Sequence, residues 1–445
     1  MPPYDIPAAV GRLVTECAYP EIAEWADHHL NARATDTDAL KAFGPRDSRA
    51  RPPNLAGPAT PSGGISHVRS LRMPLRLRTI TRDEHLAFVA ARPSASHLQV
   101  PSWGEVKPDW RAESLGWSDE EGRLVGAGLV LCRPVPKLRR YLAYLPEGPL
   151  IDWHATDLDR WLEPLLAHLK RQGAFSVRMG PPVVVRRWSA DAVKAAIADP
   201  DVHRLRDVAA TSYEPGALDI AERLRRAGWR QSEAGAEDGF AAGQPRYVCQ
   251  VPFAGRSLED IQGGLNQQWR RNIKKAEKAG VKVVRGGYAD LPAFYELYAE
   301  TADRDRFLPR PLPYFQRMWT ALTAEHPDRM RLYLAHHDGD VLAAATMLTV
   351  GDHVWYSYGA STARKREVQP NNAMQWRMMT DAHELGAAVY DFRGITDTLE
   401  ETDHLLGLLR FKTGAGGEAV EYLGEWDFPL NRLLHKALGL YMARR

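Results

Sequence analysis

The chain has 445 residues, of which 44% are hydrophobic and 26% charged, and its formal net charge is +2. This is the composition of an ordinary globular protein with room for two or three domains. No apolar run is long enough to span a membrane and the N-terminal region lacks a secretory signal, so we expect a cytoplasmic protein. Cys17, Cys132 and Cys249 form no CxxC pair, which argues against a zinc site, a redox dithiol or a disulfide framework.

The N-terminal end differs in composition from the rest. Phe43–Ser70 is rich in proline and glycine and poor in large apolar residues, so this stretch cannot repay the entropy of ordering. Ile6–Asn31 could form a short helix but is too small to hold a core. We predict that residues 1–72 are an extension, largely disordered or dispensable, with a small regulatory segment as the alternative. A strand at Leu75–Ile80 and a helix beginning near Thr81 open the main body.

The main body contains an internal repeat. The same order of predicted elements occurs twice: a strand hairpin, an amphipathic helix and a further strand. We call each occurrence a pass of the repeat. The first pass comprises Arg123–Leu150, the helix Thr156–Gln172 and the strand Ala174–Met179, and the second comprises Val341–Ala360, the helix Asn371–Leu385 and the strand Ala388–Phe392. We predict an α/β (α+β) fold of two domains, 73–250 and 251–445, with a groove for a large substrate between them.

The first candidate binding residue is Lys107. The segment from Ser96 begins as an extended run and turns at Pro101 into a helical pattern that contains Trp103 and Val106. A lysine at the end of such a turn can lie on the surface with its stem along an apolar face. The other interpretation is an ammonium group that faces a phosphate.

A basic helix is predicted at Ile261–Gly280, with Gly280 as its C-terminal cap. Its apolar positions follow three- and four-residue spacing, and its cations share the other side. Those cations are Arg270, Arg271, Lys274, Lys275 and Lys278. Two rows of cations suit a contact with several phosphates, because guanidinium groups bind oxyanions in bidentate fashion. A solvated charged face remains the alternative.

Two further segments contain candidate site residues. Alternation predicts that Tyr356 and Tyr358 share one face of a strand, where they could stack on a sugar or base or lie in the core. The stretch Leu409–Lys412 is predicted as a strand end that leads into a glycine-rich turn, Gly414–Gly417. The Walker and dinucleotide-binding glycine patterns are absent, as are the HExxH and GxSxG motifs.

Six motifs in order resemble those of the FemABX family of peptidoglycan bridge-forming aminoacyltransferases. They are SHLQVPSWGEVK, YLPEGPLID, QQWRRNIKKAEKAGVKV, YSYGAS, VYDFRGI and RFKTGAGGEAVEYLGEWDFP. The resemblance covers nearly all of Met73–Arg445. Within the family, the sequence is particularly similar to actinobacterial members that resemble lipid II:glycine glycyltransferases.

The resemblance implies two tandem GNAT-like domains and an enzyme that moves an amino acid, most simply glycine, from aminoacyl-tRNA to the side-chain amine of a stem peptide. The acceptor would be lipid II or UDP-MurNAc-pentapeptide, at the inner face of the plasma membrane if it is lipid-linked. Neither ATP nor coenzyme A would be needed, because the tRNA ester already supplies the activation. No cofactor, metal or DNA partner is expected.

The resemblance also implies residue roles. Lys107 and Arg271 match residues that hold the diphosphate of the precursor, Tyr356 and Tyr358 correspond to aromatic residues that line its site, and Lys412 matches a lysine that is important for transfer. The sequence identifies no general base, and water, a substrate phosphate or an acid such as Asp391 could take the proton.

Several features depart from the family pattern. Gly180 stands where relatives often have aspartate before proline, and Ala415 stands where phenylalanine is common. After the basic helix the chain leaves no room for the coiled-coil arm of some relatives, so any tRNA contact would come from the globular body. The alternatives are tRNA-dependent synthesis of an antibiotic or other peptide, an acetyl-coenzyme A-dependent GNAT acyltransferase, and a non-catalytic RNA-binding or cell-wall scaffold protein.

Overall fold

The computed structural model describes residues 75–135, 138–232 and 243–436. The sheets and helices named below lie in one unit, formed by Leu75–Pro134 and Arg140–Asn431. The predicted extension at residues 1–72, with the short helix expected at Ile6–Asn31, lies outside the described residues.

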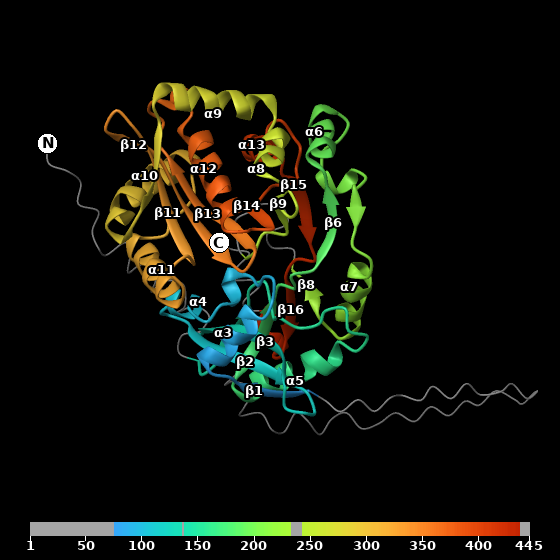
Figure 1. Cartoon of the computed structure of the whole chain (residues 1–445). Coiled ribbons are helices and arrows are strands. Elements are labelled where there is room, and N and C mark those ends of the chain that lie inside the picture. The colour runs from blue at the N-terminus through green and yellow to red at the C-terminus, as the bar shows by residue number, and fades with distance from the viewer. Residues whose placement is uncertain (1–74, 136–137, 233–242, 437–445) are drawn as a thin grey trace, which may run out of the picture. The chain divides into compact units, whose positions relative to one another are not determined.

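A seven-stranded sheet holds the first pass of the repeat (Figure 1). Its strand order is β1-β2-β3-β4-β5-β16-β8. The bounds in that order are Arg76–Thr79, Arg111–Ser118, Leu124–Pro134, Tyr141–Leu145, Ala174–Met179, Trp426–Pro429 and Arg230–Gln231. The strand and helix expected at the start of the main body are β1 and α3 (Arg82–Ala90), and the Thr81 side chain caps α3.

A nine-stranded sheet holds the second pass. Its strand order is β10-β11-β12-β13-β14-β9-β15-β6-β7. The bounds in that order are Lys282–Gly286, Met330–His337, Asp340–Val350, His353–Ser361, Val389–Gly394, Tyr247–Pro252, Glu418–Tyr422, Val184–Trp188 and Ser212–Tyr213.

The internal duplication is confirmed in the pairing of the strands. Strands β3 and β4 form an antiparallel pair, and β5 pairs in parallel with β4 after helix α5 (Asp159–Arg171). Strands β12 and β13 are likewise antiparallel, and β14 pairs in parallel with β13 after helix α12 (Pro370–Glu384). Both helices form because apolar residues recur at three- and four-residue spacing and are buried against the strands, as are Trp161, Leu165 and Leu169 in α5.

The two halves of the chain exchange strands. Strand β16, near the C-terminal end, pairs with β5 in the seven-stranded sheet, whereas β6 and β7 precede residue 250 and belong to the nine-stranded sheet. The predicted domain boundary between residues 250 and 251 falls inside β9, which pairs with β14 and β15. The chain therefore passes between the sheets more than once.

The remaining helices surround the two sheets. Their bounds are α4 Trp103–Val106, α6 Ala190–Ala198, α7 Ala217–Arg226, α8 Leu258–Gly264, α9 Gln267–Ala279, α10 Leu291–Asp305, α11 Leu312–Glu325 and α13 Leu406–Gly414, with 3-10 turns η2 His97–Gln99, η3 Leu205–Asp207, η4 Tyr288–Asp290 and η5 Arg366–Val368. The extended run expected after Ser96 is thus the turn η2. The prediction of one continuous helix at Ile261–Gly280 was wrong, because two helices, α8 and α9, occupy this segment.

The break in that helix has a local cause. Leu265 has an extended backbone at the end of α8, and Asn266 starts α9 by accepting a hydrogen bond from the Trp269 backbone N–H at 2.9 Å. Gly280 ends α9 in the left-handed conformation, with φ at 82°, as the sequence predicted.

A shared core joins the two passes of the repeat. It contains Leu129 and Leu131 of β3 together with Leu332 of β11 and Phe315 of α11. Because these side chains are close-packed, the two passes are held in a fixed relation.

The coiled-coil arm is absent from the described part of the chain, as predicted. The longest helices there, α10 and α12, have 15 residues each and pack on strands of the nine-stranded sheet. None of the described helices is long and apolar enough to cross a bilayer.

Candidate functional site

Lys107 lies in a group of cations and aromatic rings. It follows directly after α4, and its Nζ is 5.2 Å from the centre of the Trp110 ring. The guanidinium carbon of Arg133 is 5.6 Å from the same ring. Trp110 therefore has two cations within the distance of a cation–π contact.

Arg310 completes this group from another part of the chain. It lies in the connection between α10 and α11, with its guanidinium carbon 5.6 Å from the ring centre of Tyr314. The hydroxyl oxygens of Tyr314 and Tyr358 are 3.1 Å apart. We call Lys107, Arg310, Tyr314 and Tyr358, together with Trp110 and Arg133, the cation–aromatic cluster.

The cluster has the electrostatics of an anion site. Burial lowers the pKa of Lys107 to about 8, and the nearby charges of Arg310 and Arg133 add to the decrease. Within residues 75–135, 138–232 and 243–436, Lys107 forms no ion pair with a carboxylate. Cations that repel one another are stabilised by a bound anion, and a phosphate ester suits two or three of them.

A buried carboxylate fixes the two helices that carry the cluster. The Ser102 backbone N–H, beside α4, donates to Oε2 of Glu325 in α11 at 2.9 Å. The Glu325 side chain is buried and also lies 3.3 Å from Arg329. This bond ties Lys107, at one end of α4, to the helix that carries Tyr314.

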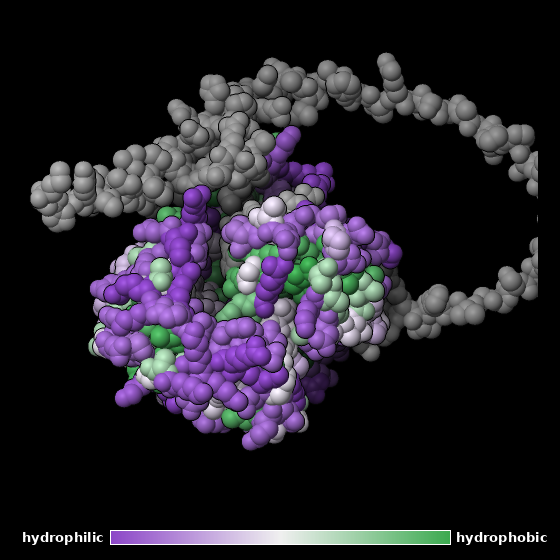
Figure 2. All heavy atoms as spheres, turned by 90° about the horizontal axis from the view of Figure 1, so that it is seen from above, coloured by the Kyte–Doolittle hydropathy of each residue, from purple (hydrophilic) through white to green (hydrophobic). Residues whose placement is uncertain are grey.

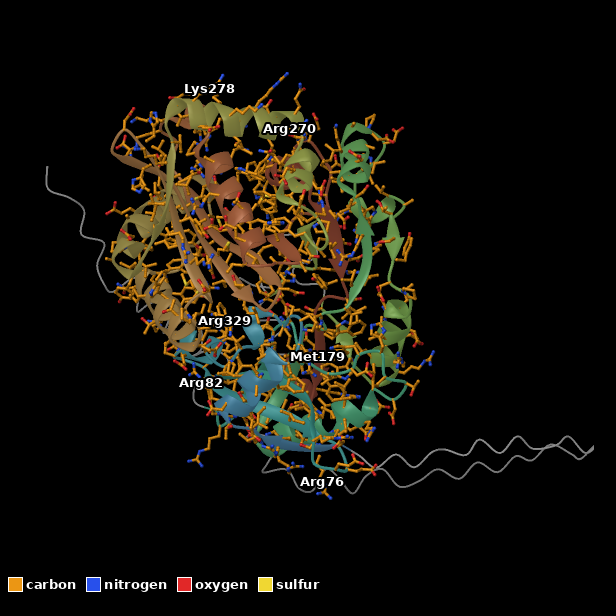
Figure 3. All side chains as sticks on the ribbon, in the orientation of Figure 1. Arg76, Arg82, Met179, Arg270, Lys278 and Arg329 are labelled. Carbon is orange, nitrogen blue, oxygen red and sulfur yellow. The ribbon has the colours of Figure 1, made fainter. Side chains whose placement is uncertain are left out.

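Arg271 does not lie in this cluster. It is exposed on α9, whose buried side chains are Trp269 and Ala276. Figure 1 shows α9 at the far end of the nine-stranded sheet from α4, and Figure 3 labels Arg270 and Lys278 along that helix. The structure therefore does not bring Arg271 together with Lys107, and the cation that it places beside Lys107 is Arg310.

The basic face of α9 is a separate feature of the surface. Its five cations are all exposed. Seen from the side that α9 occupies, the surface is largely hydrophilic, with apolar side chains beside a hollow (Figure 2). Such a face is suited to a polyanion, and it is distinct from the cation–aromatic cluster.

The prediction that Tyr356 and Tyr358 share one face was wrong. A β-bulge interrupts the pairing of β12 with β13, so that Thr346 faces Tyr358 while the next residue, Met347, faces Tyr356. The extra residue, Ser357, turns the two tyrosines to opposite faces. Tyr358 packs against α10 and α11, within the cluster, whereas Tyr356 packs in the core under α12.

Tyr356 has the surroundings of a core residue. Its ring lies 6.1 Å from that of Phe392, edge to face, and its hydroxyl occupies the space that a side chain at Gly359 would fill. Burial raises the pKa of Tyr356 to about 12. Of the two tyrosines, only Tyr358 is placed to contact a ligand held by Lys107.

Lys412 is buried, and it is helical. The expected strand end at Leu409–Lys412 is part of α13, in which Leu406 and Leu409 face the core at helical spacing. Lys412 is 3% exposed, and its ammonium donates to the carbonyl oxygen of Gly394, at the end of β14, at 2.5 Å. Burial lowers the pKa of Lys412 to about 8, although Cys249 and Asp391 oppose the shift.

A buried polar network continues from Lys412 along β14. Asp391 Oδ2 accepts from Gln250 at 2.9 Å and lies 3.3 Å from His353 Nε2. Burial alone would raise the pKa of Asp391, but His353, Arg393 and Gln250 hold it below its usual value. A carboxylate held in its ionised form in this way is a weak base, so Asp391 is better suited to structure than to proton transfer.

The network reaches the first pass through Arg393. Its Nη1 donates to Glu147 at 2.7 Å and its Nη2 donates to Gln244 at 2.7 Å. Glu147 follows β4, so the bond joins the end of β4 in the first pass to β14 in the second. We call this contact between the two passes the seam. The internal repeat predicts such a contact in general, but no local sequence pattern identifies Arg393.

Glu425 is an acid of the seam whose pKa is strongly shifted. Its Oε1 accepts from the Tyr144 hydroxyl at 2.5 Å and from the Gln244 backbone N–H at 3.3 Å. Burial raises the pKa of Glu425 to about 7, although Arg178 and Tyr144 oppose the shift. A Cβ at Gly180 would lie 3.7 Å from Glu425 Cγ, so Gly180 borders this side chain.

The sequence analysis did not identify Arg310, Tyr314 or Glu425 as site residues. Arg310 and Tyr314 belong to a proline-rich turn and the helix after it, and only the tertiary packing of α11 on α4 brings them to Lys107. Among the described residues, no group of three or more His, Cys, Asp or Glu side chains is arranged to hold a metal ion.

Comparison with known proteins identifies the family of this chain. The sequence model of the FemAB family matches residues 80–340 and 333–442. A lipid II:glycine glycyltransferase of Staphylococcus haemolyticus (strain JCSC1435) is 26% identical, covering 81% of this chain and 94% of that protein, and one of Staphylococcus aureus (strain MRSA252) is 24% identical over the same shares. The chain belongs to the FemAB family.

A solved structure supports the fold. The crystal structure of FemX aligns with a TM-score of 0.67 at 24% identity, over 81% of this chain and 99% of that one. The fold expected from the sequence, a mixed α/β architecture with an internal duplication, is confirmed.

Proposed function

We propose that this protein is an aminoacyltransferase that adds an amino acid, most simply glycine, to the side-chain amine of a peptidoglycan stem peptide. The observation that carries the proposal is the match to proteins named lipid II:glycine glycyltransferase along 94% of their length. The proposed donor is aminoacyl-tRNA, with no further cofactor, and the proposed location is the cytoplasm or the inner face of the membrane.

The cation–aromatic cluster is the proposed site for the diphosphate of the precursor. Lys107 and Arg310 supply charge, and the Tyr314 and Tyr358 hydroxyls supply hydrogen bonds. Their adjacency supports this role, with Nζ of Lys107 and the guanidinium carbon of Arg133 over one ring and Arg310 over another. Binding energy from this remote group would position the reactive amine and so accelerate transfer.

The chemical step is aminolysis of an ester. The neutral acceptor amine attacks the ester carbonyl, the new C–N bond forms as the C–O bond to ribose breaks, and a proton passes from nitrogen to the departing ribose oxygen. Negative charge develops on the carbonyl oxygen, and a positive charge near it stabilises the transition state. We assign this role to Lys412, whose ammonium lies beside the end of β14 at the seam.

The decisive experiment is transfer of radiolabelled amino acid. Purified protein is mixed with tRNA charged with glycine, alanine or serine, and with lipid II or UDP-MurNAc-pentapeptide that carries lysine or diaminopimelate. Product with one donor, abolished by ribonuclease, is the expected result and names the amino acid.

Other results would contradict the proposal in defined ways. Product from acetyl-coenzyme A instead would favour a GNAT acyltransferase. No product with any pair, alongside intact charged tRNA, would favour a different peptide acceptor or a scaffold that binds without catalysis.

A further inference from the structure

The connection between α10 and α11 exposes two large apolar side chains. Leu308 is 87% exposed and Phe307 is 40% exposed, and Leu308 is the most exposed large hydrophobic residue among those described. We call residues 306–311 the tip loop. Single exposed apolar residues are common on proteins, but two in succession at the end of a connection call for a partner surface.

The structure holds the tip loop in a defined conformation. Arg306 ends α10 with a positive φ of 57°, and the Phe307 N–H donates to the Ala302 carbonyl at 3.1 Å. One side of the Phe307 ring packs on Tyr298, with 5.5 Å between ring centres. Pro309 and Pro311 further restrict the backbone. Leu308 is therefore presented outward at a small cost in conformational entropy.

The tip loop belongs to the same surface as the cation–aromatic cluster. Arg310, which is two residues from Leu308, is itself a member of that cluster. Tyr298, on which the Phe307 ring packs, also contacts the Tyr358 ring with 6.0 Å between centres. Any surface that covers Leu308 thus comes close to the proposed diphosphate site.

Charge around the tip loop selects the kind of partner. Arg306 and Arg310 are exposed on either side of Leu308. The nearest acid in sequence, Asp305, pairs with Arg304 at 2.8 Å. Apolar side chains flanked by cations are the pattern of segments that lie in the interface of an anionic bilayer, where the apolar part enters the acyl boundary and the cations meet lipid phosphates.

We propose that the tip loop docks on an anionic lipid bilayer, with Leu308 in the interface, and thereby holds the cation–aromatic cluster at the level of lipid phosphates. The membrane docking stands without the catalytic step. Its consequence, that the enzyme prefers a lipid-linked acceptor over a soluble nucleotide-linked one, rests on the proposed function.

The first test is vesicle binding, which needs no catalysis. Full-length protein is sedimented with phosphatidylcholine vesicles with and without phosphatidylglycerol. We expect binding to the anionic vesicles and a partition coefficient at least about fivefold lower for Leu308→Ser, because an apolar side chain is lost from the interface. Leu308→Asp should lower it further. Leu218→Ser is the matched control, since Leu218 is 72% exposed on α7, and it should bind like the unaltered protein.

The second test separates membrane docking from catalysis. Leu308→Ser should raise KM for lipid-linked precursor in vesicles at least about threefold, while KM for a soluble nucleotide-linked precursor stays unchanged. Absence of turnover with both acceptors would contradict the proposed function but leave the vesicle result standing.

Two outcomes would overturn the proposal. One is equal vesicle binding by Leu308→Ser, Leu308→Asp and the unaltered protein. The other is loss of vesicle binding on Lys274→Glu and Lys275→Glu with no effect of the Leu308 changes, because this would place the membrane contact on α9. Loss of tRNA binding without loss of vesicle binding in the α9 variants would agree with the proposal.

Discussion

Glu147 and Arg393 form an ion pair across the internal repeat, with 2.7 Å between Oε1 and Nη1. Both residues have a positive φ, 47° and 62°, in a region that side chains other than glycine rarely adopt. Glu147 follows β4 of the first pass, and Arg393 lies near the end of β14 of the second pass. Backbone strain of this kind persists only where surrounding contacts impose it, so the pair holds the two strand ends together.

Removal of one partner should destabilise the fold. Arg393→Ala leaves Glu147 with a largely buried, unpaired charge and should lower the free energy of unfolding by about 3 kcal/mol. The matched control is Arg123→Ala, because Arg123 pairs with Asp119 while 73% exposed and should change stability by no more than about 0.5 kcal/mol. Urea denaturation measures both. Equal, small effects would show that the seam does not depend on this pair.

The cation–aromatic cluster predicts a division among three basic residues. Lys107→Ala and Arg310→Ala should each weaken precursor binding by about tenfold to a hundredfold, the range for a lost charge-assisted hydrogen bond. Arg271→Ala should leave precursor affinity close to normal, since Arg271 lies on the distant α9. Calorimetric titration with a soluble nucleotide-linked precursor gives the three affinities. A loss in Arg271→Ala as large as in Arg310→Ala would restore the pairing first expected from the sequence.

The titration of Lys412 predicts an alkaline limit on transfer. With a folded-state pKa lowered to about 8, the ammonium that we assign to the transition state is lost above that pH. The acceptor amine must be neutral to attack, and its neutral fraction grows with pH, so the rate constant for transfer should rise with pH and level off above about 8, where the Lys412 ammonium is lost, after correction for spontaneous ester hydrolysis. Lys412→Arg keeps its charge and should let the rise continue past pH 8, even if its rate is lower. A rate that keeps rising past pH 8 in the unaltered protein, as in Lys412→Arg, would contradict a role for the Lys412 charge.

The free energy of unfolding should also depend on the titration of Lys412. Because the folded-state pKa of Lys412 lies below its ordinary value of 10.5, the unfolded chain binds more protons between about pH 8 and pH 10.5. This group therefore makes stability rise with pH across that window. Lys412→Met should remove that contribution, which denaturation at several pH values would measure.

Glu425 predicts a pH dependence of the opposite sign. Its pKa is raised to about 7 from 4.5, so between these values the folded protein binds more protons than the unfolded chain. The contribution of Glu425 to stability is complete below pH 4.5 and is lost as pH rises through 7. Glu425→Gln should flatten this part of the profile, whereas Glu163→Gln, on the exposed side of α5, should leave it unchanged. An unchanged profile for Glu425→Gln would mean that the carboxyl is ionised throughout.

Local sequence pattern was sufficient for the regular elements. The strand Ala174–Met179 has the predicted bounds, and Gly280 ends its helix as predicted, because periodicity and capping depend on neighbours in the chain. The pattern failed where one residue changes the register. Ser357 in the bulge reverses the relation of Tyr356 to Tyr358, and no local signal distinguishes such a bulge from continuous alternation.

The sequence by itself determined the family and the duplicated α/β architecture, and it marked Lys107 as a candidate residue for binding a phosphate. Only the tertiary structure decided the partners of that lysine. Arg310 is about two hundred residues away in sequence, and it reaches the cluster because Glu325 and the shared core hold α11 against α4. Helical and strand periods are local properties of the chain, whereas the meeting of distant charges depends on how whole elements pack, which no local period encodes.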